Sequence, residues 1–120
     1  MQEQALRSAE QAYGPEHLYV SFRLDSVGDA LLARSEVEKA RALFEQARRI
    51  RERATSPDHP LVAHSMMKLA QIAIRRGEFA TARALYQAAL DIRERAFGRN
   101  DLHVANTLNE LGLVMWRLND

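Results

Sequence analysis

Residues 42 to 54 read ALFEQARRIRERA, and residues 84 to 96 read ALYQAALDIRERA. Sliding the whole chain by 42 residues aligns 14–55 with 56–97 without a gap, and 15 positions are then identical. A composition rich in Ala and Arg gives roughly three matches by chance, so the duplication is real. A repeat of this length is typical of stacked structural units, in which a surface rather than a catalytic cluster carries the function.

Partial copies flank the two complete ones. A third copy begins at Gly98 and reaches Asp120. Ahead of the first copy, Ala5, Ala12, Tyr13 and Gly14 match Ala89, Ala96, Phe97 and Gly98. We therefore predict a single domain over 1–120. Its segments are 1–13 (second helix of a partial repeat), 14–55 (repeat 1), 56–97 (repeat 2) and 98–120 (first helix of a partial repeat).

Apolar residues recur within each copy at spacings of three and four, which predicts amphipathic helices. The first helix of each copy carries Leu24, Val27 and Leu31, then Met66, Leu69 and Ala73, then Leu108, Leu111 and Met115. The second helix carries Ala40, Phe44 and Ala47, then Ala82, Tyr86 and Ala89. The predicted fold class is all-α, with about six helices in antiparallel helix-turn-helix repeats.

Turn residues and small residues also recur in register. Ser35, Gly77 and Asn119 occupy equivalent places between helices, and these residue types tolerate the left-handed conformation that closes a helix. Gly28, Ala70 and Gly112 coincide as well, and small side chains let two helices pack closely. We expect Phe44 and Tyr86 to fill the space opposite them.

Composition excludes several classes of protein. The 17 Lys and Arg residues nearly balance 16 Asp and Glu, so a net charge of +1 gives no long-range attraction to nucleic acid or anionic lipid. Cysteine is absent, which excludes disulfides and thiolate chemistry and fits a reducing compartment. The longest apolar runs, 30–33 and 113–116, are far shorter than a membrane span, and the first residues do not resemble a secretory signal. We expect a cytoplasmic protein.

The order of small and large residues resembles the tetratricopeptide repeat, and the 42-residue period resembles its kinesin light chain-like subtype. In the second copy the resemblance rests on Leu69, Ala70, Gly77, Phe79, Ala82, Tyr86, Ala89 and Leu90, followed by DIRERAFG. In the first copy it rests on Val27, Gly28, Val37, Ala40, Phe44 and Ala47, followed by RIRERA. The resemblance covers the whole chain and implies an α-solenoid that coils as a right-handed superhelix. It specifies the fold far more closely than the ligand.

The resemblance also implies a concave groove, lined mainly by the first helix of each pair, that holds a peptide or a helical segment of another protein. Carried onto this sequence, the groove is expected to be lined by Phe22, Asp25, Asp29, Leu32, His64, Met67, Lys68, Gln71, Ile74, Arg75, Asn106, Asn109, Glu110, Leu113, Trp116 and Arg117. The resemblance to the family, and not the spacing of the residues, indicates which face is concave.

The chemistry of these residues constrains the ligand. Asp25 and Asp29 stand where some members of the family place a clamp for a C-terminal carboxylate, and they would repel one. Asn106 and Asn109 can hold peptide backbone through their amide groups. Trp116 is either an anchor for the ligand or a cover for the apolar end of the stack.

Several motifs have a structural reading beside a functional one. The arginine run 48–53 can contact phosphates or form a solvated outer face with ion pairs Glu45 to Arg49 and Arg48 to Glu52, and near-neutral charge favours the second. His17 and His59 recur beside a proline and an acid, as expected of a motif that starts a helix. Met67 is either an adaptable contact or simply exposed.

Catalytic and metal-binding signatures are absent from the sequence. The four histidines have no recognised metal spacing, so we predict no metal and no cofactor. Asp25 and Asp29 resemble a paired acid, but an open groove would leave both carboxylates solvated and ionised. We therefore predict that the chain is not an enzyme.

The leading hypothesis for function is a noncatalytic protein-binding module that docks a partner in the groove. The alternative is self-association as a scaffold, including a homodimer, through the exposed faces of the terminal helices; we expect Leu111, Val114 and Met115 to be partly uncovered there. A third hypothesis is nucleic-acid binding through the arginines, which the neutral net charge disfavours.

Overall fold

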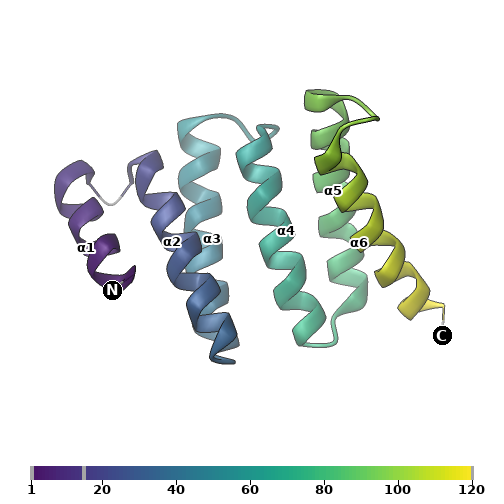
Figure 1. Ribbon diagram of the computed structural model, residues 1–120, viewed down its shortest axis with the longest axis horizontal. Coiled ribbons are helices and arrows are strands. Elements are labelled where there is room, and N and C mark those ends of the chain that lie inside the picture. The colour runs from purple at the N-terminus through teal and green to yellow at the C-terminus, as the bar shows by residue number, and fades with distance from the viewer. Residues whose placement is uncertain (1, 15, 120) are drawn as a thin grey trace. The chain divides into compact units, whose positions relative to one another are not determined.

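A computed structural model describes residues 2–14 and 16–119 of the chain. The described residues form six α-helices with no strand between them (Figure 1). They are α1 (Gln2–Tyr13), α2 (Leu18–Ala33), α3 (Val37–Ala54), α4 (Pro60–Arg75), α5 (Phe79–Phe97) and α6 (Leu102–Leu118). The predicted all-α fold of antiparallel helix-turn-helix repeats is confirmed.

The chain divides into two compact units, Met1–Pro57 and Asp58–Asp120. In the first unit α2 and α3 form an antiparallel hairpin, and α1 packs against α2 (Figure 1). In the second unit α4 and α5 form the equivalent hairpin, and α6 packs against α5. Each hairpin therefore lies within one 42-residue copy of the sequence.

Tight turns join the helices of each hairpin. Ser35 and Gly77 have φ angles of 65° and 76°, in the left-handed region that lets a helix close. The backbone N–H of the residue after each turn then donates to a carbonyl of the last helical turn, Glu36 to Leu31 and Glu78 to Ala73. Asn119 does not share this geometry: its φ of −84° is right-handed. The expectation for Asn119 was wrong because its residue type permits a left-handed turn without requiring one.

Three equivalent side chains cap the first helix of each copy. The Nδ1 atoms of His17 and His59 accept backbone N–H groups two residues on, at 3.0 and 3.1 Å. A carboxylate oxygen of Asp101 does the same at 2.8 Å. Each cap satisfies a donor that the start of a helix leaves free. The helix-start reading of His17 and His59 is confirmed.

The small and large residues of the repeat meet in the cores. Phe44 and Tyr86 are fully buried, as are the alanines that precede and follow each of them on α3 and α5. The ring of Phe44 lies so close to Gly28 that a Cβ added there would stand 2.6 Å from Cε1. The hairpin of the first unit therefore requires a glycine opposite the ring or a shift of the helices.

One side of α6 is more exposed than the equivalent sides of α2 and α4. Leu111 and Val114, which the sequence analysis expected to be partly uncovered, are buried. Both pack in the apolar cluster of the second unit. Met115 is exposed as expected, and so is Leu108, whose counterparts Leu24 and Met66 are buried. The uncovered face of α6 therefore carries Leu108 and Met115.

Candidate functional site

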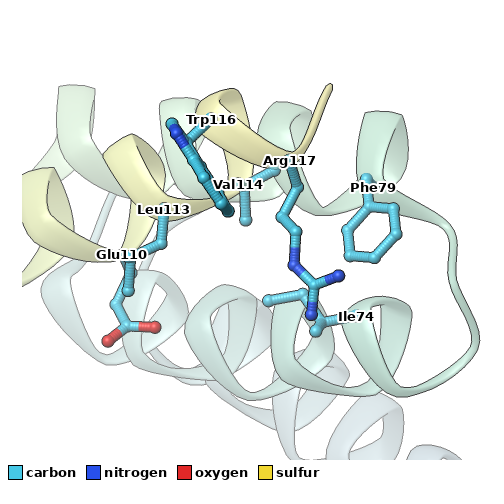
Figure 2. Close-up of a pocket in the computed structure, with 7 residues that line it drawn as sticks. All are labelled: Ile74, Phe79, Glu110, Leu113, Val114, Trp116 and Arg117. Atoms are coloured by element: carbon cyan, nitrogen blue, oxygen red, sulfur yellow. The ribbon is translucent and has the colours of Figure 1, made fainter. Parts of the chain in front are cut away.

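A hollow of about 340 Å³ opens in the second unit between α4, α5 and α6. Its lining consists of Ile74, Phe79, Glu110, Leu113, Val114, Trp116 and Arg117. Figure 2 shows the three apolar residues of α6 along one side, with Arg117 reaching toward Ile74 and Phe79 at one end and Glu110 at the other. We call this site the α4–α6 hollow.

The apolar wall of the hollow is unusually open to solvent. Trp116 is 65% exposed and Leu113 is 57% exposed, although each is a large side chain that water solvates poorly. Val114 also lines the hollow but is only 2% exposed, so it forms the buried side of the site. Exposed apolar side chains around a concave site are typical of a binding surface.

Opposite charges flank the apolar wall. The guanidinium carbon of Arg117 lies 5.3 Å from the centroid of the Phe79 ring, a cation–π contact that holds the side chain over the hollow. At the other end, the Tyr86 hydroxyl donates to a carboxylate oxygen of Glu110 at 3.5 Å. A ligand in the hollow would meet a cation at one end and an anion at the other.

The Tyr86 phenol is perturbed by its position beneath Glu110. Burial, and then the negative charge and hydrogen bond of Glu110, raise the pKa of Tyr86 to about 12. The phenol therefore stays protonated at neutral pH and keeps donating to Glu110. It thereby helps to position the acidic end of the hollow.

Five of the residues predicted from the sequence line this hollow together: Ile74, Glu110, Leu113, Trp116 and Arg117. Sequence reasoning missed two others, Phe79 and Val114. Phe79 begins the second helix of its repeat, whereas the expected lining came only from first helices. Its place directly after the Gly77 turn is the signal that it lies near the end of α4.

Other predicted residues of the second unit lie outside the hollow. His64, Lys68, Gln71 and Arg75 are on α4, and Asn106 and Asn109 are on α6. Both asparagines are exposed. Met67 is 6% exposed and packs in the apolar cluster, so it presents no surface to a ligand. Both readings that the sequence left open for Met67 were wrong, because neighbouring helices cover it.

Four predicted residues belong to α2 in the first unit. Phe22 and Asp29 are exposed, and Leu32 is half-buried. Asp25 is only 6% exposed, and a carboxylate oxygen lies 2.8 Å from a terminal nitrogen of Arg51. The expectation that Asp25 is a solvated groove residue was wrong. Asp25 instead compensates a charge buried in the hairpin.

The same contact corrects the reading of the arginine run. Arg51 is fully buried, its Nε donates to the Ser21 hydroxyl at 3.0 Å, and its guanidinium carbon lies 4.9 Å from the Phe22 ring centroid. The run is therefore not a uniformly solvated face. The predicted pair of Arg48 with Glu52 is present at 3.6 Å. Glu45 pairs with Arg41 at 2.9 Å.

Comparison with known proteins identifies the repeat. The sequence model of the tetratricopeptide repeat matches residues 1–53, 21–93 and 61–120. The chain belongs to the tetratricopeptide repeat family. Because the overlapping matches span the whole chain, membership does not depend on one segment. None of the curated proteins is significantly similar to it in sequence.

A solved structure shows the same fold. BtubC (BKLC) from P. vanneervenii superposes with a TM-score of 0.77 at 23% sequence identity, over 98% of this tetratricopeptide chain and 51% of BtubC. The chain thus spans about half the length of BtubC. At this identity the likeness establishes the fold class, an α-solenoid of helical repeats, and agrees with the kinesin light chain-like subtype predicted from the 42-residue period.

Family membership defines a broad class of function. Tetratricopeptide repeats mediate protein–protein interactions and form scaffolds rather than catalytic centres. In the described part of the chain, no helix combines the length and the apolar character that crossing a membrane requires. The partner and the surface that binds it do not follow from the family.

Proposed function

We propose that this protein is a noncatalytic binding module that holds a peptide or a helical segment of another protein in the α4–α6 hollow. The observation that carries the proposal is the pair of exposed side chains, Trp116 and Leu113, beside a concave site flanked by Arg117 and Glu110. Large apolar side chains that become buried on binding supply most of the affinity of such interfaces.

The chemistry of the hollow specifies the kind of segment that fits. An apolar side chain of the partner would cover Trp116 and Leu113, removing both from water. Polar groups on either side of it would reach Arg117 and Glu110, which set the direction of the segment. The exposed amides of Asn106 and Asn109 add donors and acceptors for peptide backbone on the same helix.

A peptide library screened against the whole chain tests this proposal. The strongest binder is then measured by isothermal titration against Trp116→Ala and Asn109→Ala. Because Trp116 is the largest exposed apolar side chain of the hollow, we expect Trp116→Ala to weaken binding by about thirtyfold, as for an interface hot spot. For Asn109→Ala we expect a smaller loss, of about fivefold, from one hydrogen-bonding side chain.

Leu102→Ala serves as the matched control. Leu102 is a highly exposed apolar residue at the start of the same helix and does not line the hollow. Its removal should leave the affinity unchanged. Unchanged affinity in both Trp116→Ala and Asn109→Ala would reject the hollow as the binding site.

Self-association is the second candidate function, and the exposed Leu108 and Met115 on α6 favour it. An isologous contact between such faces would bury both residues in a homodimer. Multi-angle light scattering across a hundredfold range of concentration separates the two candidates. A strict monomer eliminates self-association, and a tight dimer abolished by Leu108→Ser supports it.

Two features of the arginine run support the prediction that nucleic acid is not the partner. Arg51 is buried against Asp25, and Arg53 pairs with Glu16 at 2.7 Å. Phosphate binding needs several exposed and uncompensated cations on one face. A labelled oligonucleotide at low salt should therefore show no binding.

A further inference from the structure

Two opposite charges in the α4–α6 hollow have no counter-ion among the described residues. The guanidinium of Arg117 contacts the Phe79 ring, and the carboxylate of Glu110 contacts the neutral hydroxyl of Tyr86. Neither Arg117 nor Glu110 forms an ion pair within the described chain. By contrast, Arg41 on α3 pairs with two glutamates of its own helix, at 3.2 and 2.9 Å. The hollow therefore presents one cation and one anion that a ligand can neutralise.

Both charged groups keep hydrogen-bonding capacity that a ligand can use. The cation–π contact with Phe79 leaves the N–H donors of Arg117 able to bind a carboxylate, which a guanidinium can hold through two parallel hydrogen bonds. The Tyr86 hydroxyl lies 3.5 Å from one carboxylate oxygen of Glu110, so the second oxygen can accept from an ammonium or a guanidinium. An acidic group therefore complements Arg117, and a basic group complements Glu110.

These side chains occupy positions that stay accessible when further helices follow. Three residues of α6 in the hollow have equivalents on α4, 42 residues earlier: Glu110 with Lys68, Leu113 with Gln71, and Arg117 with Arg75. On α4, Gln71 and Arg75 are exposed and Lys68 is half-buried, although α5 and α6 follow within the same unit. A ligand can therefore reach these positions whether or not another helix comes after them.

The order of charges distinguishes α6 from α4. Arg75 and Arg117 are equivalent and both basic, whereas α4 has the basic Lys68 where α6 has the acidic Glu110. Helix α4 thus carries two cations at these positions, and α6 carries an anion and a cation. Because the positions are not part of the buried core, the charge that each carries can determine which ligand binds.

Building on the proposed function of the hollow as a binding site, we propose that it selects an extended segment of another protein with a mixed charge pattern. In this segment an acidic and a basic residue lie four positions apart, and an apolar residue lies midway between them. The acidic group binds Arg117, the apolar side chain packs on Leu113, and the basic group binds Glu110. A segment with two charges of one sign meets a like charge at one end and binds less tightly.

The spacing within the segment follows from the geometry of α6. Glu110 and Arg117 are seven residues apart on this helix, which separates them by about 10.5 Å along its axis. An extended chain advances about 3.3 Å per residue, so residues four positions apart are separated by about 13 Å. Those two residues and the one midway between them point to the same side of the segment. The long charged side chains can span the difference between the two separations.

Trp116 provides a local measure of binding. It is the single tryptophan of the chain, it lines the hollow, and it is exposed, so a ligand that covers it shifts its fluorescence emission to shorter wavelength. The probes are four peptides, GSETLTKSG, GSKTLTESG, GSETLTESG and GSKTLTKSG, which are titrated into the whole chain up to millimolar concentrations at low salt. Acetylated and amidated ends remove the terminal charges of the peptides. A fifth peptide, GSETSTKSG, lacks the apolar residue.

We expect the tighter of the two mixed-charge peptides to bind about fivefold more strongly than either peptide of single sign, since it gains an ion pair and avoids a like-charge contact. The order of charges in that peptide gives the direction of the segment in the hollow. High salt should remove the preference while binding of the leucine persists, because salt screens exposed charges. The peptide without the apolar residue should leave the emission of Trp116 unchanged.

Charge reversal in the protein locates the selection. Glu110→Lys should transfer the preference to the acidic peptide GSETLTESG, and Arg117→Glu should transfer it to the basic peptide GSKTLTKSG, each by about fivefold. Lysine already occupies the equivalent position of α4, and circular dichroism checks that both variants keep their helices. Asp91→Lys is the matched control, because it changes the net charge as Glu110→Lys does, at an exposed position of α5 outside the hollow. It should keep the preference for mixed charge.

The outcomes separate charge selection from binding in the hollow. Equal affinities for all four charged peptides, or a preference that Glu110→Lys does not alter, would overturn the selection and leave the hollow as an apolar peptide site. An emission that no peptide shifts would overturn both the selection and the hollow as a binding site. An emission of Trp116 that shifts with protein concentration in the absence of peptide would place a second copy of the chain in the hollow, and would also overturn the selection.

Discussion

Arg51 and Arg93 occupy the same position in the two complete repeats, 42 residues apart, and both are buried. Their surroundings differ. Arg51 pairs with the carboxylate of Asp25 on the preceding helix of its own hairpin, at 2.8 Å. Arg93 donates to the hydroxyl of Thr107 on the helix that follows, at 2.8 Å.

The difference arises because α2 and α4 carry different residues at two equivalent positions. Ser21 and Asp25 of α2 correspond to Ala63 and Met67 of α4, which have no acceptor to offer. Arg93 therefore finds a neutral partner instead of a charged one. Burial lowers the pKa of Arg93, and the nearby carboxylate of Asp101 offsets part of this effect.

A buried arginine thus persists in both repeats, while its direct partner has changed from the carboxylate of Asp25 to the hydroxyl of Thr107. The energetic consequence should be large, because a charge buried without its counter-ion is far more costly than one that loses a neutral hydrogen bond. Replacing Asp25 and Thr107 in separate variants measures this difference in stability.

Replacing Asp25 should have the largest effect. Asp25→Ala leaves the guanidinium of Arg51 buried without its counter-ion, and we expect the free energy of unfolding to fall by about 3–5 kcal/mol. Urea denaturation followed by circular dichroism measures the loss. The double variant Asp25→Leu with Arg51→Met is the control, because an apolar pair of similar volume should recover most of the stability. A loss below about 1 kcal/mol for Asp25→Ala would show that the ion pair does not compensate the buried charge.

Replacing Thr107 should have a smaller effect. Its hydroxyl accepts from Arg93 and donates to the backbone carbonyl of His103 at 2.7 Å. Thr107→Val keeps the shape and removes the hydroxyl, so the free energy of unfolding should fall by about 1.5–3 kcal/mol, as for a hydrogen bond to a charged group. Thr107→Ser retains the hydroxyl and should retain most of the stability. Equal losses in the Val and Ser variants would show that the methyl group matters rather than the hydrogen bond.

Another pair of equivalent residues, Phe44 and Tyr86, extends the comparison of the two repeats to the pH dependence of stability. The pKa of Tyr86 is raised to about 12 in the folded chain, whereas an unfolded tyrosine titrates near pH 10. The raised pKa contributes stability below pH 10 that is lost as the pH rises toward 12, and the loss is on the order of 1 kcal/mol by pH 11. Urea denaturation at pH 9 and pH 11 measures this loss.

Tyr86→Phe gives the second repeat the residue type of Phe44 in the first repeat, and it removes the phenol that titrates. The variant should lose less stability than the unchanged protein between pH 9 and pH 11. Absorbance at 295 nm should show a phenol that ionises well above pH 10 in the unchanged protein and that is missing from Tyr86→Phe. An identical pH dependence in both proteins would contradict the raised pKa of Tyr86.

Local sequence predicted the helices and their ends well. Periodic apolar residues predict a helix whatever it packs against, and Ser35, Gly77, His17 and His59 act on backbone groups only a few residues away. The 42-residue repeat added the resemblance to the tetratricopeptide family, which the match over the whole chain confirms.

The candidate site was predicted only in part. Ile74, Glu110, Leu113, Trp116 and Arg117 line the α4–α6 hollow, but Phe79 joins them from a helix that the sequence did not assign to the site. Met67 was placed correctly on its helix and yet is buried, because exposure depends on a neighbouring helix that periodicity does not locate. The exposed residues Asn106, Asn109, Phe22 and Asp29 stay predictions, of which Asn109→Ala tests one.

The sequence by itself determined that the chain repeats, where its helices begin and end, and which faces are apolar, because each of these follows from contacts within a few residues. Tertiary structure alone decided that Arg51 is buried against Asp25. It also decided that Arg93 turns to Thr107 and that Gly112 stands open where Gly28 is covered. Those outcomes depend on which helix packs against which, since burial and charge compensation are properties of two surfaces in contact and not of one segment.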